Sequence, residues 1–151
     1  MKISVKRATL DNVDDIAVLF DSYRVFYEQA SDIDVARRFL TERLSAQESV
    51  IFCACDENNT YLGFTQLFPT FSSVSAERMW ILNDLFVASN ARGHGVGTQL
   101  MNAAKQHAIE TKTKGLVLST ATDNHTAQSL YETLGYERDT EYYTYFLSTR
   151  G

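Results

Sequence analysis

A glycine-rich segment in the middle of the chain has the composition of a phosphate-binding loop. It reads Arg92-Gly93-His94-Gly95-Val96-Gly97, after an apolar run that ends at Val87 and before an amphipathic stretch over residues 98–110. Glycine lets the backbone approach a ligand in conformations that side chains forbid. The first amides of a helix lack internal partners and carry the positive end of its dipole, so they bind phosphate. The pattern therefore predicts a strand, a phosphate loop and a helix, with Arg92 as an added cation.

The glycine spacing excludes two common phosphate loops. A dinucleotide fingerprint begun at Gly93 or Gly95 would need its third glycine at Thr98 or Leu100. A nucleotide-triphosphate loop needs a lysine, and residues 77–103 contain none. The segment instead resembles the R/Q-x-x-G-x-G/A pyrophosphate loop of the GCN5-related N-acetyltransferase (GNAT) family, which binds acetyl-coenzyme A. A glycine-rich helix start without a ligand is the simpler alternative.

A second block, residues 124–136, resembles the N-x-x-A-x-x-L-Y-x-x-L-G-F/Y segment of the same family. Its pattern predicts a helix with Asn124 as N-cap and Gly135 in the left-handed position after the last turn. An ordinary capped core helix would explain both ends, but not the occurrence of this helix downstream of the glycine loop. The two blocks together carry the resemblance to the GNAT family from Ile81 to Tyr136, and the resemblance is looser before Ile81.

The resemblance implies where acetyl-coenzyme A binds. The loop would hold the pyrophosphate, and the backbone of the preceding strand would pair with the pantetheine arm and polarise the thioester carbonyl. The side chain of His94 is expected to face solvent. The residues implied for coenzyme binding are Phe86, Val87, Arg92, Gly93, His94, Gly95, Val96, Gly97, Thr98, Asn124 and Tyr131.

Two residues are the candidates for proton transfer. Tyr131 matches the family's tyrosine near the coenzyme sulfur, where a phenol of pKa ~10 can protonate a thiolate whose thiol pKa is ~8.5; a packed tyrosine is the alternative. Many relatives carry a glutamate where this chain has Asn83, which cannot act as a base. Asp84 is therefore the leading general base, directly or through water, and a structural carboxylate is its alternative. Neighbours on a strand face opposite ways unless a bulge intervenes, so the direction of Asp84 is open.

The acceptor amine would lie beside the first long helix, which borders the acceptor site in this family. The predicted substrate-binding residues are Tyr23, Tyr27, Glu28 and Asn83. Glu28, Asp32 and Asp34 could form an acidic rim for a cationic amine, although an ordinary solvated face is the simpler interpretation. The predicted reaction is direct acetyl transfer to a primary amine of a polyamine-like small molecule, a peptide lysine or an N-terminus. The alternative is a non-catalytic acetyl-coenzyme A-binding regulatory module.

Composition limits the remaining possibilities. The chain has 151 residues, 44% of them hydrophobic, and a net charge of -5, so we expect one domain over 1–151 and no nucleic-acid partner. No run is long enough to span a membrane and no signal peptide is recognised, so we expect a cytoplasmic protein. Cys53 and Cys55 lie two apart in an apolar strand and are expected to be buried free thiols. The histidines lack companion ligands, so no metal is expected.

The alternation of hydrophobic patterns predicts a mixed α/β sheet with helices on both faces. The resemblance implies the GNAT fold, a mostly antiparallel sheet in the order β-α-α-β-β-β-α-β-α-β-β, with a splayed parallel strand pair around Leu85 and Leu118. Asp11 is expected to cap the first helix and Pro69 to end a strand. Because the last strand is unusually aromatic, we expect a homodimer through it. The predicted strands are 3–7, 50–55, 61–68, 78–87, 115–120 and 142–147, and the second helix is 34–46.

Overall fold

The computed structural model describes residues 1–150. Two compact units make up the chain, one from Met1 to Ser119 and the other from Thr120 onward. Two short 3-10 turns, η1 (Leu10–Asn12) and η2 (Ser89–Ala91), accompany the main elements. The first unit contains β1 (Ser4–Arg7), α1 (Val13–Phe26), α2 (Ile33–Ser45), β2 (Val50–Cys55), β3 (Tyr61–Ser72), β4 (Glu77–Val87), α3 (Val96–Glu110) and β5 (Leu116–Val117), and the second contains α4 (His125–Thr133).

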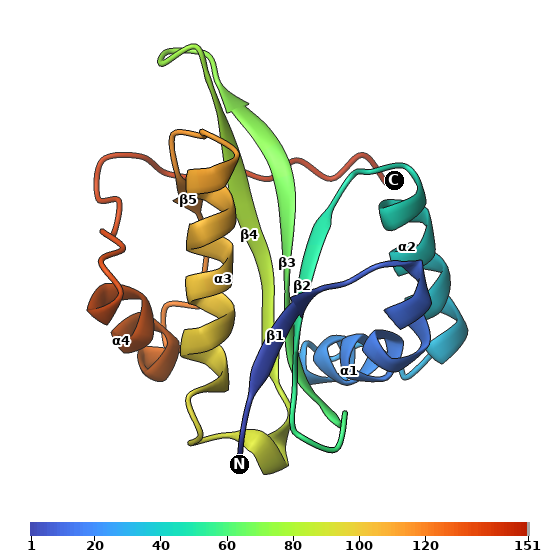
Figure 1. Cartoon of the computed structure of the whole chain (residues 1–151). Helices are drawn as coiled ribbons and strands as arrows, with labels where there is room; N and C mark the ends of the chain where they lie inside the picture. Colours follow the sequence, from blue (N-terminus) through green and yellow to red (C-terminus); the bar gives the residue numbers. More distant parts are fainter. Residues whose placement is uncertain (151) are drawn as a thin grey trace. The chain divides into compact units, whose positions relative to one another are not determined.

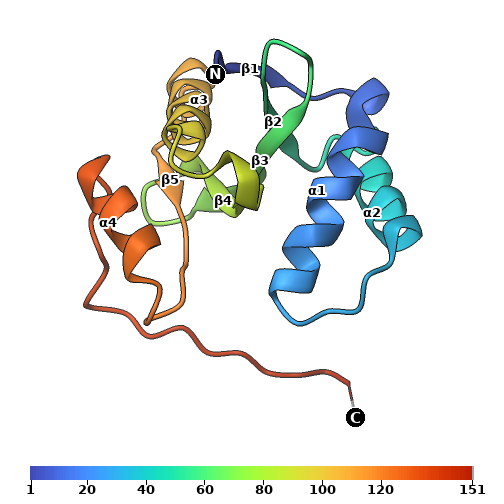
Figure 2. The same cartoon turned by 90° about the horizontal axis from the view of Figure 1, so that it is seen from below.

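The first unit is built on a five-stranded sheet in the order β1-β2-β3-β4-β5 (Figure 1). Strands β1 to β4 pair antiparallel, and β5 runs parallel to β4. Helices α1 and α2 cover one face of the sheet, and α3 covers the other (Figure 2). The mixed sheet with helices on both faces confirms the predicted α/β class.

Each face of the sheet has its own apolar core. Phe20 and Leu40 pack with Phe64 on the face of α1 and α2, while Val96 and Leu100 pack on the face of α3. Gly63 of β3 lies close to both β4 and α3. A Cβ built on Gly63 would lie 2.6 Å from the Phe86 carbonyl oxygen and 3.3 Å from Leu100 Cδ1. Glycine at this position therefore allows β4 and α3 to pack as they do.

The start of α1 differs from the prediction. Asp11 is not the cap: Thr9 is the N-cap of the 3-10 turn η1, and its hydroxyl oxygen accepts from the Asp11 amide at 3.2 Å, whereas Asn12, the N-cap of α1, makes no side-chain cap bond. The Asn12 side chain accepts in return from the Thr9 amide at 2.9 Å, which completes a capping box. A 3-10 turn therefore precedes the helix, and α1 begins at Val13. The signal was present in the sequence as a threonine three residues before an asparagine.

Pro69 does not end β3, which continues to Ser72 and pairs Pro69 with Trp80 of β4. The reason is the length of β2, whose pairing with β3 stops at Val50↔Leu67. Beyond Leu67, β3 has no partner on the side of β2 among the described residues, so a missing N–H there breaks no ladder bond.

A hairpin joins β2 to β3, and the prediction of buried free thiols is confirmed. Asp56 Oδ1 accepts from the amides of Asn58 and Thr60, each at 2.9 Å, and closes the turn between β2 and β3. Cys53 and Cys55 are both buried and free. Burial raises the pKa of Cys53 to about 12, so its thiol stays protonated at neutral pH.

The C-terminal strand prediction is wrong. Residues 142–147 form neither helix nor strand, and the aromatic side chains there are exposed. Strand β5 is also shorter than predicted, covering only Leu116–Val117. Aromatic composition favours a strand, but a strand requires a ladder partner, and none of the described residues supplies one for 142–147. None of the helices in residues 1–150 is long and apolar enough to cross a bilayer.

Candidate active site

The glycine loop has the backbone that the sequence predicts for anion binding. Gly93 and Gly95 take left-handed φ values of 83° and 78°. Gly95 is the N-cap of α3 and offers no side chain to bond the first amides of the helix. A Cβ built on either glycine would meet no atom within 4 Å, so the loop borders open space. These amides fit a coenzyme pyrophosphate, with the helix dipole adding to the attraction.

Arg92 and α3 fix the loop to the sheet. The Arg92 Nε donates to the Val87 carbonyl oxygen at 3.3 Å, which links the loop to the last residue of β4. Val96 and Leu100 of α3 are buried against Leu62 of β3. The start of the helix is therefore held beside the end of β4. The guanidinium group of Arg92 adds a positive charge close to the glycine loop.

Among residues 1–150, the half of β4 that ends at Val87 has no strand paired to the edge on the side of β5. Strand β5 pairs with β4 only at Trp80↔Leu116 and Ile81↔Val117, although β4 continues to Val87. This is the separation of parallel strands that the GNAT resemblance implied. The Ala88 amide donates to the Leu62 carbonyl oxygen at 2.8 Å. Because main-chain groups alternate along a strand, those of Val87 face away from β3 and those of Phe86 face toward it. Contacts of either backbone with pantetheine stay a prediction.

Asp84 lies in a cluster of polar side chains, which we call the Asp84 cluster: Tyr23, Gln66, Asn83 and Asp84. Asp84 itself is buried, with 4% of its surface exposed. Gln66 Nε2 donates to Oδ2 at 2.5 Å, and Asn83 Nδ2 donates to Oδ1 at 3.0 Å. The Tyr23 hydroxyl is a third hydrogen-bond partner of the carboxyl group. Strands β3 and β4 and helix α1 each contribute to the cluster.

The direction of Asp84 follows from its register, and a β-bulge lies directly before it on β4. Asp84 pairs with Gln66 in unbroken register with Phe64↔Phe86, so by alternation it points to the face of the sheet that α1 covers, where Tyr23 reaches it. The register then passes to Leu67↔Leu82, so Asn83 is an extra residue on β4. Asn83 is exposed, whereas both of its neighbours are buried. The question that strand alternation left open is thereby answered for the carboxylate.

The surroundings of Asp84 suit a proton acceptor. Burial raises the pKa of its carboxyl group above the ordinary value of 3.8, while hydrogen bonds from Gln66, Tyr23 and Asn83 act in the opposite direction. A raised pKa makes a carboxylate a stronger base, and the bonds keep it oriented. Such a balance in a buried group is typical of functional sites.

A line of aromatic rings leads from the Asp84 cluster to the surface. The Tyr23 ring centroid lies 6.1 Å from that of Phe86 and 5.1 Å from that of Tyr27. Phe26 follows at 5.2 Å from Tyr27, and both of these residues are more than half exposed. The structure therefore brings four predicted residues, Tyr23, Tyr27, Asn83 and Asp84, to one place. Glu28 follows Tyr27 directly, is exposed and takes a left-handed φ of 67°.

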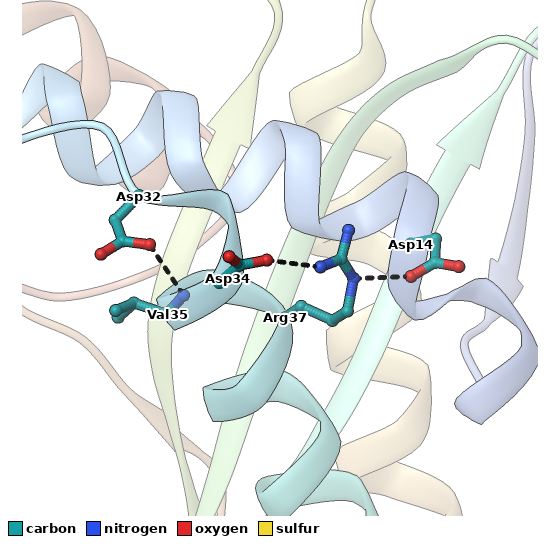
Figure 3. A network of polar contacts seen from close by, with 5 residues as sticks. All are labelled: Asp14, Asp32, Asp34, Val35 and Arg37. Atoms are coloured by element: carbon teal, nitrogen blue, oxygen red, sulfur yellow. Dashed lines mark hydrogen bonds and ion pairs between the residues drawn. The ribbon is translucent and has the colours of Figure 1, made fainter.

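Asp32 and Asp34, the other two residues of the possible acidic rim, have structural partners (Figure 3). The Asp32 Oδ1 accepts from the Val35 amide at 3.2 Å and caps α2. Arg37 donates to Asp34 and to Asp14, each at 2.9 Å, and joins α2 to α1. These roles favour the ordinary structural interpretation of Asp32 and Asp34 over an acidic rim.

The second unit has the local structure that its motif predicts. Asn124 Oδ1 accepts from the Ala127 amide at 3.2 Å and caps α4, and Gly135 takes a φ of 94° after the last turn. Tyr131 lies in α4, half-buried, with its ring 6.1 Å from that of Tyr136. Burial, and to a lesser extent Tyr131, raises the pKa of Tyr136 to about 12. The roles of Asn124 and Tyr131 at the coenzyme stay predictions.

Sequence reasoning missed Gln66. It lies among six consecutive buried residues of β3, Leu62 to Leu67. A long polar side chain inside such an apolar run was the available signal, because buried polar groups need partners. Among the described residues, no group of three His, Cys, Asp or Glu side chains could hold a metal ion.

Comparisons with known proteins agree with this geometry. The model of the acetyltransferase (GNAT) family matches residues 16–136. An uncharacterized N-acetyltransferase of Bacillus subtilis, YhfO, is 49% identical over 146 residues, or 97% of each chain. A probable acetyltransferase of Haemophilus influenzae is 34% identical over 126 residues, or 83% of this chain and 84% of that one.

A solved structure also matches closely. The crystal structure of a probable acetyltransferase has a TM-score of 0.91 and 44% identity, and the match covers 96% of this chain and 97% of that one. The glycine loop and the separated strands agree with the family match and with these similarities. The chain therefore belongs to the GNAT family of acetyl-coenzyme A-dependent N-acetyltransferases.

Proposed function

We propose that this chain transfers the acetyl group of acetyl-coenzyme A to a primary amine of a polyamine-like molecule, a peptide lysine or an N-terminus, with Asp84 as general base. The observation that carries the proposal is the Asp84 cluster: a buried carboxylate with a raised pKa, next to an aromatic line that reaches the surface. A substrate ammonium of pKa ~10 must lose a proton before its nitrogen can attack. We infer that Asp84 accepts this proton.

The proposed reaction has one acyl transfer and three proton movements. Asp84 takes one proton from the acceptor ammonium, and the freed lone pair of the nitrogen forms the new C–N bond to the thioester carbonyl carbon. A backbone N–H at the open edge of β4 stabilises the developing oxyanion. The C–S bond breaks, Tyr131 donates its proton to the leaving thiolate, and the tyrosinate regains a proton from the positively charged nitrogen of the adduct. The products are the N-acetylated amine and the free thiol of coenzyme A.

Two features support a cationic acceptor. The chain has a net charge of -5, which attracts cations at low ionic strength. The exposed rings of Phe26 and Tyr27 lie at the outer end of the line that leads to Asp84. Aromatic faces bind ammonium groups, so a polyamine-like acceptor leads over a neutral peptide amine.

A regulatory module that binds acetyl-coenzyme A without turnover is the second candidate. Asn83 favours it, because asparagine occupies the position where many relatives carry a glutamate base. The two candidates differ in one observable, the release of thiol in the presence of an amine.

The test is a panel of amines screened for release of free thiol from acetyl-coenzyme A. The proposal predicts turnover with at least one primary amine, faster for polyamines than for a peptide with a neutral backbone. Tight coenzyme binding by calorimetry, without thiol release across the panel, would support the regulatory module instead.

A homodimer and a cytoplasmic location are also part of the proposal. Tyr143, Tyr145 and Phe146 are each about nine-tenths exposed, which supports an interface because aromatic residues are enriched in interface cores. Light scattering at micromolar concentration should give twice the chain mass. Replacing Tyr145 and Phe146 together by serine should return the mass to that of a monomer, and a monomeric wild-type chain would exclude the dimer.

A further inference from the structure

Gln66 of β3 has one unsatisfied polar atom in the apolar core. The residue is 0% exposed, and its Nε2 donates to Asp84 Oδ2 at 2.5 Å. Its Oε1 is buried and has no hydrogen-bond partner among residues 1–150. Burying an unpaired acceptor destabilises the folded state. A methionine would fill the same space without that cost, so the amide calls for an explanation.

The chemistry of an amide supplies one. An ionised carboxylate only accepts hydrogen bonds, whereas a protonated carboxyl group also donates one. In the arrangement seen, Gln66 donates to Asp84, which matches the ionised form. When Asp84 takes up a proton, rotation of the amide about its last bond brings Oε1 to the carboxyl O–H as an acceptor. A lysine or arginine could only donate, and would hold the carboxyl pKa low.

The other groups around the carboxyl differ from Gln66. Tyr23 from α1 is half-buried and is the titratable member of the cluster besides Asp84. Asn83 is exposed, so water can satisfy its amide in either state. Thr65 donates to the Asp84 main-chain carbonyl oxygen at 2.8 Å and is not bonded to the carboxyl group. Gln66 is therefore the fully buried partner of the carboxyl group, and the side-chain oxygen that it leaves unpaired is buried as well.

We propose that Gln66 is a positioning residue that holds Asp84 in both protonation states, donating to the carboxylate and accepting from the carboxylic acid. The role of this hydrogen bond in catalysis rests on the proposed function. A general base must keep the proton that it takes from the amine until the product leaves, and a buried acid without an acceptor would be destabilised. The bond itself can be tested without turnover.

The test compares Gln66→Met with the control Thr65→Val in the full chain. The control also removes a buried hydrogen bond to Asp84, but one that ends on the main chain. Carbon-13 NMR of the carboxyl group follows Asp84, and Tm is measured above and below its titration midpoint. Gln66→Met should raise the midpoint by about 1 pH unit, because a bond to a charged group is stronger than one to a neutral group. It should lower Tm by roughly 5 °C at both pH values.

Two outcomes would overturn the inference. An unchanged midpoint would mean that Gln66 does not act on the carboxyl group. A Tm loss that disappears below the midpoint would mean that Gln66 serves the ionised form alone. Thr65→Val should lower Tm and leave the midpoint in place; an equal shift in the control would assign the effect to general loosening of the strands.

Kinetics separate this inference from the proposed function. If both hold, the acid limb of kcat/KM moves with the NMR midpoint in Gln66→Met, while coenzyme affinity stays the same. A shift in the NMR midpoint without a shift in the kinetic profile would reject Asp84 as the base and keep the role of Gln66. If Gln66→Met does not fold, Gln66→Glu replaces it. Two adjacent carboxyl groups must then share a proton, raising the midpoint by more than about 1 pH unit; an unchanged midpoint would overturn the inference.

Discussion

The glycine loop and the Asp84 cluster both depend on β4, but they are built by different means. The loop follows the end of the strand, and its features are local: left-handed glycines, an uncapped helix start and Arg92 bonded back to Val87. The Asp84 cluster combines two neighbouring residues of β4 with a glutamine from β3 and a tyrosine from α1. We propose that open backbone serves coenzyme binding in the first region and that side chains around a buried carboxyl group serve proton transfer in the second.

The difference predicts how variants will behave. Changes in the loop should alter coenzyme affinity and leave the pH dependence of the reaction in place. Changes in the proton-transfer groups should alter the pH dependence or the rate of the reaction and leave coenzyme affinity in place. A variant that alters both together would break the distinction.

Apart from changes to Asp84 itself, the largest of these effects is expected for Tyr131→Phe. The change removes only the hydroxyl that we assign to protonation of the thiolate, so kcat should fall roughly 100-fold while coenzyme affinity stays nearly constant. Steady-state kinetics and calorimetry on the same preparation provide the measurement. Tyr136→Phe, on the neighbouring ring in the second unit, is the matched control and should keep most of its activity. Wild-type kcat in Tyr131→Phe would return that residue to a packing role.

Gly95→Val should weaken coenzyme binding by roughly 30-fold. A β-branched residue at a φ of 78° is strained, and its side chain enters the open space in which the amides would meet phosphate. Gly115→Val is the control, because a Cβ at Gly115 also meets nothing within 4 Å and its φ is not left-handed. Equal affinities of the two variants for coenzyme A, by calorimetry, would show that the loop does not bind the pyrophosphate.

Gly63→Ala tests the support that the two regions share. The added methyl group would lie 2.6 Å from the Phe86 carbonyl oxygen, so β3, β4 and α3 must separate. We expect a loss of about 1.5 kcal/mol in the free energy of unfolding, by urea titration. Gly115→Ala should change it far less. Full wild-type stability in Gly63→Ala would mean that the sheet adjusts freely and does not hold the site rigidly.

The smallest effect concerns pH and stability. Since burial raises the pKa of Asp84 in the folded chain, the folded state binds this proton more tightly than the unfolded state. The resulting stabilisation is complete below the unfolded pKa of ~3.9 and is lost as pH rises through the folded value. Relative to Asp84→Asn, the wild type should lose on the order of 1 kcal/mol between pH 4 and 8. An equal pH dependence of both proteins would contradict the raised pKa.

The contrast between the two regions also explains what the sequence could predict. The strand, glycine loop and α3 are consecutive, and α4 carries its own cap and terminal glycine, so local rules were sufficient. The capping box of Thr9 is also local, but the prediction chose Asp11 as the cap instead. The passage of β3 through Pro69 depends on the length of β2, which local rules do not give. The predicted strand at 142–147 failed for a related reason, because composition specifies no ladder partner.

The chemistry of Asp84 shows the same limit more sharply. Its residue type made it a candidate, but the sequence does not show where a bulge interrupts the strand, and the structure places the bulge at Asn83, directly before Asp84. Gln66 and Asp84 are 18 positions apart, and their contact follows from the pairing of β3 with β4. A polar residue in a buried strand indicates that its side chain needs a hydrogen-bond partner, but not which residue supplies it.

Asp84→Asn tests the central claim most directly. The substitution keeps the size of the side chain and removes its ability to accept a proton. With a reactive amine and acetyl-coenzyme A, kcat/KM should fall about 100-fold or more and its acid limb should disappear, while coenzyme affinity by calorimetry stays unchanged. Wild-type kcat/KM with an unaltered pH profile would contradict the account and leave Asp84 as a structural carboxylate.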